Sequence, residues 1–164
     1  MTRFIANIMM AAALLLGAAA CGEVNDERIP AVSVNVELSN PGYWDIYGVH
    51  GLGQSRIFIK NDRIPADFPF TAMTFTGFGG ILLVTDLSNS PLAYDLACPV
   101  EVSPTVRVRF NPDNLEARCP ECGSVYNVCE YQGSAVSGVA YDRKYGLRRY
   151  RVLPAVTGGY NIVF

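Results

Sequence analysis

The chain has 164 residues, with 13 Lys and Arg, 15 Asp and Glu, and a formal net charge of −2. A charge so close to zero gives no electrostatic reason to expect binding to nucleic acid. The length fits one domain that can bury its own core. Beyond residue 20 no apolar run reaches the roughly 20 residues that a membrane-spanning helix needs.

The N-terminus has the pattern of an export signal. Arg3 precedes an almost wholly apolar segment, 4–20, that ends in small residues directly before Cys21. This pattern is typical of a bacterial lipoprotein signal peptide over residues 1–20, whose cleavage leaves a lipidated Cys21. The alternatives are an uncleaved membrane anchor and an ordinary signal cut before Cys21. We expect 21–31 to be a tether, and a lipid-anchored location in the bacterial cell envelope, on the periplasmic face or at the outer membrane.

Strand signals dominate the rest of the chain, and helix signals are almost absent. Apolar and polar residues alternate over 32–38, which predicts a half-buried strand, and the apolar run 81–84 suits a fully buried one. Turn residues such as those at 40–42 separate the apolar segments. Further strands are expected at 56–60, 92–97, 106–110, 115–118, 124–128, 147–153 and 160–164. These segments predict a single all-β domain over 32–164, an antiparallel sandwich or partly open barrel.

The cysteines are concentrated in one window of the sequence. Two loops that each begin with Cys-Pro, at Cys98 and Cys119, lie 21 residues apart with β-like sequence between them. The second loop also contains Cys122, which completes a Cys-x-x-Cys half-site. Cys129 follows the strand predicted at 124–128, which would carry it roughly 20 Å from Cys122 if extended. Any metal or redox chemistry is therefore expected between the two loops.

This window resembles the Rieske iron–sulfur domain. In that family the first loop carries Cys-x-His, and the second commonly reads Cys-Pro-x-His-Gly-Ser-x-Tyr or Phe. Residues 119–126 read CPECGSVY, so Cys122 stands at the second His position, while Val100 stands at the first. The resemblance extends from about residue 32 to the C-terminus. It implies a Rieske-like β fold with a two-loop, cluster-type subdomain at about 96–140.

The lost histidines exclude a Rieske centre, because that cluster needs two His ligands on one iron. The chain has a single histidine, His50, far from the cysteine window in sequence. The resemblance therefore implies a bacterial envelope lipoprotein with degenerate cluster ligands. For such a protein we expect a binding or structural role with no cofactor, no catalytic residue and an unknown partner, apart from a membrane contact through the lipid.

Three uses of the cysteines remain open from the sequence. Cys98, Cys119 and Cys122, with Cys129 as a candidate fourth ligand, could hold zinc or a two-iron, two-sulfur cluster, as in an electron-transfer protein. The same four cysteines could form disulfides after export, and the sequence does not choose among the three connectivities. A thiol–disulfide redox role is the third option, although the Cys-x-x-Cys lacks the thioredoxin-like helix that lowers a thiol pKa.

Overall fold

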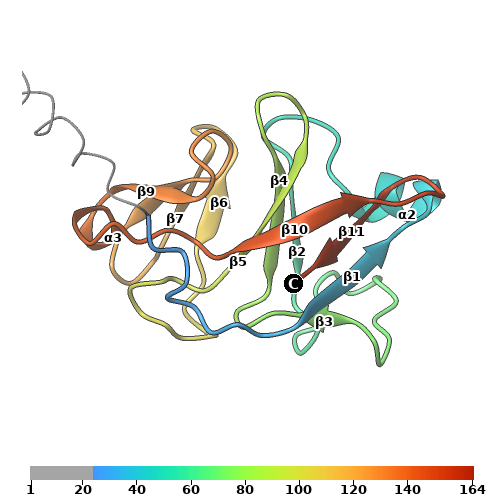
Figure 1. Cartoon of the computed structure of the whole chain (residues 1–164), viewed down its shortest axis with the longest axis horizontal. Helices are drawn as coiled ribbons and strands as arrows, with labels where there is room; N and C mark the ends of the chain where they lie inside the picture. Colours follow the sequence, from blue (N-terminus) through green and yellow to red (C-terminus); the bar gives the residue numbers. More distant parts are fainter. Residues whose placement is uncertain (1–23) are drawn as a thin grey trace, which may run out of the picture.

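The structure, a computed structural model, describes residues 24–164 and is built almost entirely from antiparallel strands (Figure 1). One sheet has the strand order β2-β4-β5-β10-β11-β1-β3, and a second has the order β6-β7-β8-β9. The strands of the larger sheet are β1 (Val34–Leu38), β2 (Ser55–Phe58), β3 (Phe75–Thr76), β4 (Ile81–Thr85), β5 (Pro91–Asp95), β10 (Arg149–Pro154) and β11 (Tyr160–Val163). Those of the smaller sheet are β6 (Arg109–Asn111), β7 (Glu116–Arg118), β8 (Val125–Asn127) and β9 (Ser134–Ser137). The all-β prediction is confirmed.

The larger sheet curls into a nearly closed, barrel-like form. Its two edge strands, β2 and β3, approach each other. The amide of Lys60, just beyond β2, donates to Oγ1 of Thr76 in β3 at 3.2 Å. Strand β4 lies between β2 and β5, and all five of its residues are buried. Leu82 and Leu83 are neighbours in β4 but belong to two different core clusters, one on each face of the strand. This explains the unbroken apolar run, since successive side chains point to opposite faces and both faces are covered.

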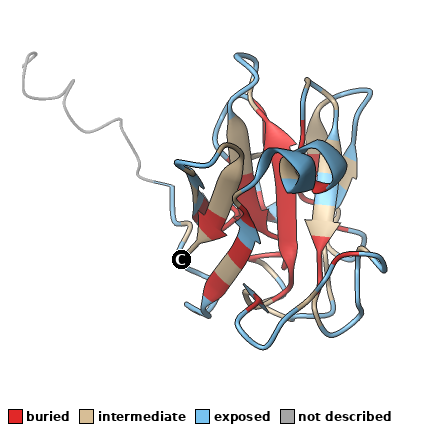
Figure 2. Ribbon diagram, turned by 90° about the vertical axis from the view of Figure 1, so that its right-hand side faces the viewer, coloured by how far each residue is buried: buried red, intermediate tan, exposed pale blue. Residues whose placement is uncertain are grey.

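Buried residues are concentrated in the strands, and the connecting loops are mostly exposed (Figure 2). The first core cluster lies toward the smaller sheet and includes Tyr94, Tyr126 and all four cysteines of the described chain, three of them buried and Cys122 half-buried. The second cluster fills the other face of β4 and includes Phe58 and Ile162. The cysteine window therefore belongs to a packed core rather than to a loose surface loop.

Residues 40–42, expected from the sequence to be a turn, instead begin a short helix, α2 (Pro41–Tyr47). The side-chain oxygen of Asn40 accepts the amide of Tyr43 at 2.8 Å and caps the helix, and Pro41 occupies the first helical position. Both residues are typical helix starts as well as turn formers. The turn prediction was therefore wrong here, because the aromatic residues that follow continue the helix.

The smaller sheet is formed by the segment that carries the two Cys-Pro loops. Strand β5 leads into the first loop, the hairpin β6–β7 follows, and the second loop joins β7 to β8. The strand predicted at 106–110 is shorter than expected, since only Arg109–Asn111 is regular and Arg107 forms an isolated bridge to Ala97. Strands β3 and β9 and the short helix α3 (Val139–Asp142) were not predicted.

The described part of the expected tether is packed against the domain. Ile29 is fully buried, and its carbonyl accepts Nε of Arg148 at 2.6 Å. The Asn25 amide donates to the carbonyl of Lys144 at 2.8 Å, and its carbonyl accepts the amide of Gly146 at 2.9 Å. Residues 25 and 29, which belong to the tether expected over 21–31, are thus bonded to the domain. Cys21 and the signal segment lie outside the described residues, and within residues 24–164 neither helix has the length and apolar character to cross a membrane.

Candidate metal centre

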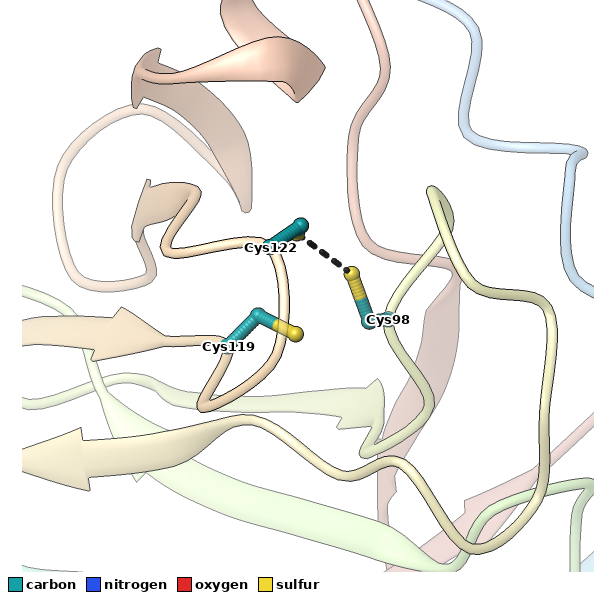
Figure 3. Close-up of side chains that lie close together, drawn as sticks. All are labelled: Cys98, Cys119 and Cys122. Atoms are coloured by element: carbon teal, nitrogen blue, oxygen red, sulfur yellow. Dashed lines mark hydrogen bonds between the residues drawn. The ribbon is translucent and has the colours of Figure 1, made fainter.

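Three cysteines come together where two loops meet, one between β5 and β6 and the other between β7 and β8 (Figure 3). Cys98 comes from the first loop, after β5, while Cys119 and Cys122 come from the loop between β7 and β8. The three Sγ atoms all lie within 4.8 Å of one another, and those of Cys98 and Cys122 are 3.6 Å apart. Cys98 and Cys119 are fully buried, and Cys122 is half-buried.

The first loop is held by hydrogen bonds on both sides of Cys98. The Cys98 amide donates to the carbonyl of Val106 at 3.0 Å, and its carbonyl accepts the amide of Val102 at 2.9 Å. Just before the cysteine, the buried carboxylate of Asp95 accepts the amide of Ala97 at 2.7 Å. The same carboxylate also accepts the amide of Gly79 at 3.0 Å. These bonds fix the end of β5 and hence the position of Cys98.

The second loop is a tight turn closed by its own backbone. The amide of Gly123 donates to the carbonyl of Cys119 at 3.2 Å, and the Cys119 amide donates to the carbonyl of Ser124 at 3.0 Å. Gly123 adopts φ of 70°, a backbone conformation that favours glycine. Ser124 is buried, and its Oγ accepts the amide of Ala140 at 3.1 Å, so the start of α3 supports the loop from behind.

Two hydroxyl groups contact the sulfurs. The Tyr126 hydroxyl lies 3.3 Å from Sγ of Cys98, and the thiol of Cys122 donates to Oγ of Ser124 at 3.3 Å. In the sequence analysis, Ser124 and Tyr126 were noted only as residues that match the second-loop motif. Their contacts with the cysteines could not be read from spacing, although buried hydroxyls next to a candidate ligand are common partners of metal-bound atoms.

The surroundings give the thiols of Cys119 and Cys122 different acidities. Burial raises the pKa of Cys119 to about 12, although hydrogen bonds from the amides of Cys122 and Glu121 oppose the rise. Burial also acts on Cys122, but hydrogen bonds from Ser124 and from the other two thiols outweigh it, so the Cys122 pKa is lowered. Burial, together with the neighbouring Cys98, raises the pKa of the Tyr126 hydroxyl well above its ordinary value. Cys122 is therefore more readily ionised than Cys119.

The candidate fourth ligand, Cys129, stays outside this group, as do Val100, at the first lost His position, and His50. Cys129 is buried beyond the far end of β8, where its amide bonds Oδ1 of Asn127 at 3.2 Å and burial raises its pKa to about 11. Val100 packs against the core and carries no donor atom. His50 is exposed next to α2, with Nε2 3.4 Å from the carbonyl of Asp45. Within residues 24–164, then, the group supplies three sulfur donors and no imidazole.

The four cysteines of the described chain are all free thiols. The 3.6 Å contact between Cys98 and Cys122 is well beyond the roughly 2.05 Å of a disulfide bond. The structure therefore contains none of the disulfides considered from the sequence among residues 24–164. What it offers is a set of three closely spaced, mostly buried thiols that can bind a soft metal ion when they are deprotonated.

No protein-family model matches this chain, and neither a curated protein nor a solved structure matches it. The resemblance to Rieske domains thus depends on the sequence pattern alone.

Proposed function

We propose that this chain is a lipid-anchored protein of the bacterial cell envelope whose Rieske-like β domain binds one soft metal ion through Cys98, Cys119 and Cys122. The observation that carries the proposal is the approach of the three Sγ atoms to within 4.8 Å of one another. With metal–sulfur bonds of about 2.3 Å, three sulfurs in a plane around one ion lie about 4 Å apart. The loops need to move by less than an ångström to reach that spacing.

The donor set favours a single ion over a cluster. Thiolates select Cu⁺, Zn²⁺ and iron–sulfur clusters among the biological metals. A two-iron, two-sulfur cluster takes four protein ligands, and the Rieske type takes two of them as histidines. The described chain brings only three donors together, so Cu⁺ or Zn²⁺ fits best, with any fourth position filled from solvent or by a partner.

A second candidate is a binding or structural module that uses no metal. The observation in its favour is the full burial of Cys98 and Cys119 in the same apolar cluster as Leu82 and Tyr94. Free cysteine often fills a core as a small hydrophobic residue. Under this alternative the three thiols meet because the two loops pack together. No ion is bound, so each cysteine could be replaced by Ala or Val without any change in metal content.

Metal analysis separates the two candidates. The full-length protein is purified under reducing conditions, stripped with a chelator, and titrated with Zn²⁺ or Cu⁺. We expect one ion per chain, and loss of that ion in each of the variants Cys98→Ser, Cys119→Ser and Cys122→Ser. Cys129→Ser is the matched control and keeps the ion, because Cys129 is buried like Cys98 and Cys119 but lies outside the group.

Two results would overturn the metal proposal. If the reduced wild-type protein binds no ion above the level of a variant with serine at all three positions, 98, 119 and 122, the cysteines serve only in packing. If stoichiometric iron is found with visible charge-transfer bands, a cluster with a further ligand takes the place of the single ion. Anchoring is tested separately with Cys21→Ala, which we expect to move the protein from the membrane fraction to the soluble fraction.

A further inference from the structure

We propose that Cys98 and Cys122 form a reversible dithiol–disulfide couple that links the two loops and, when closed, excludes the metal ion. The inference depends on the proposed function only for the metal; the couple itself depends on the placement of two sulfurs. It also differs from what the sequence spacing suggests, since the Cys-x-x-Cys pattern points to Cys119 and Cys122 as the redox pair.

The geometry selects the pair that joins the loops. The two Sγ atoms lie 3.6 Å apart, and Figure 3 marks this contact with a dashed line across the gap between the two loops. A disulfide needs a sulfur–sulfur distance of about 2.05 Å, so the atoms must approach by about 1.5 Å. Rotation of the two side chains with a small loop movement can supply this approach.

Access decides which thiol reacts first. Cys98 is fully buried, whereas Cys122 is half-buried and lines a surface cleft between the smaller sheet and the second loop. Charged side chains of both signs line the same cleft: Arg109, Arg118, Glu116 and Glu121. A small peptide disulfide with both charges, such as oxidised glutathione, matches this lining. The oxidant is therefore expected to meet Cys122 before Cys98.

The exchange proceeds in two balanced steps. The Cys122 thiolate attacks one sulfur of the oxidant, so the oxidant's disulfide bond breaks, a mixed disulfide forms on Cys122, and one thiolate leaves and takes up a proton. Cys98 then loses its proton and attacks the Cys122 sulfur, which expels the second thiolate and forms the Cys98–Cys122 bond. The protein gives up two electrons and two protons, and the oxidant is reduced to two thiols.

Closure of the pair removes two of the three donors at once. A disulfide sulfur no longer offers a thiolate, so only Cys119 remains, and one thiolate does not hold an ion against water. Conversely, an ion bound to all three thiolates occupies the sulfur electron pairs with which the thiolates would attack the oxidant. Oxidation is thus expected to release the metal, and the bound metal to protect the thiols.

The first test uses metal-free, full-length protein. It is treated with oxidised glutathione, its remaining thiols are alkylated, and non-reducing peptide mass spectrometry maps the bonds. We expect one disulfide, between Cys98 and Cys122, with Cys119 and Cys129 alkylated. A bond between Cys119 and Cys122, or no bond at all, overturns the inference.

Variants with a single cysteine replaced test the same inference through the disulfide product that each one forms. Cys98→Ser should stop at a stable mixed disulfide with glutathione on Cys122, because in this couple Cys98, and not the neighbouring Cys119, is the thiol that resolves it. Cys119→Ser and Cys129→Ser are the matched controls, and both should still form the Cys98–Cys122 bond. If Cys98→Ser forms a protein disulfide as readily as wild type, another cysteine is the partner and the inference fails.

The metal arm distinguishes this inference from the proposed function. Protein loaded with Zn²⁺ should resist oxidation, and the oxidised protein should bind no ion. If the couple closes but the reduced protein binds no metal, the proposed function fails and the couple stands. If the reduced protein binds one ion but the metal-free pair never closes, the couple fails and the proposed function stands.

Discussion

The carboxylate of Asp95 is the buried group whose removal should damage the protein most. It lies at the end of β5, fully buried, and accepts the amides of Phe78 at 2.9 Å, Gly79 at 3.0 Å and Ala97 at 2.7 Å, together with the hydroxyl of Tyr150. The substitution Asp95→Ala deletes the only side chain that these donors share. Because the bond to Ala97 immediately precedes Cys98, the loss should also loosen the first loop.

The cost follows from the donors left without an acceptor. A buried donor without a partner costs about 1–3 kcal/mol, and the Gly79 and Ala97 amides and the Tyr150 hydroxyl are all buried here. The Phe78 amide is only partly buried and can turn to water, so it adds less. We therefore expect Asp95→Ala to lower the free energy of unfolding by about 3 kcal/mol. With a urea dependence of about 2 kcal/mol per molar, the midpoint should fall by about 1.5 M.

Urea denaturation of the metal-free, reduced protein measures this shift. Asp86→Ala is the matched control, since the Asp86 carboxylate also accepts two amides, those of Ser88 and Ser90, but in an exposed turn where water can replace it. Its cost should stay below about 1 kcal/mol. Cys98 should also be alkylated faster in Asp95→Ala than in wild type. Equal midpoints for the two variants would refute the assignment of Asp95 as a buried anchor.

Three further predictions concern the site and its support. The apparent affinity for Zn²⁺ should rise with pH between 6 and 8, because burial raises the Cys119 pKa to about 12 and the ion must displace its proton; competition titrations that show no dependence on pH would contradict this. Tyr94→Phe removes a 3.0 Å hydrogen bond to a buried carbonyl and should cost about 1–3 kcal/mol in urea denaturation while leaving metal stoichiometry unchanged. Gly138→Ala should cost more than about 1 kcal/mol and weaken metal binding, because φ is 81° and a Cβ would lie 2.9 Å from Cα of Ser124. Gly51→Ala, with no atom within 4 Å of its Cβ, should leave both quantities unchanged.

The sequence predicted those strands whose side-chain pattern is strong. The strand at 81–84 could be predicted because its sequence is continuously apolar, which reflects the burial of both faces of β4. The strands of the hairpin β10–β11 could be predicted because Gly158 and Gly159 form the turn between them. Strand β3 has only two residues, which is too short to carry a period. The helix α2 was missed although Asn40 and Pro41 form a helix start, since the same residues also form turns.

The candidate site was only partly predictable, because its contacts join residues far apart in the chain. The motif placed Cys98, Cys119 and Cys122 on two loops that could face each other. It could not show that the Tyr126 hydroxyl would contact Cys98, or that Tyr150 would bond Asp95 across 55 positions. Such contacts depend on strand register and packing, which local patterns do not specify.

The packing of the N-terminal segment limits where this domain can go. Asn25 is bonded to the backbone around Lys144, only four residues after Cys21. Four extended residues span at most about 14 Å. With a lipid on Cys21, the domain could neither swing far from the bilayer nor turn over freely, and the end that carries α3 would stay close to the headgroups. A partner would then have to meet the protein at the membrane surface rather than deep in the surrounding solution.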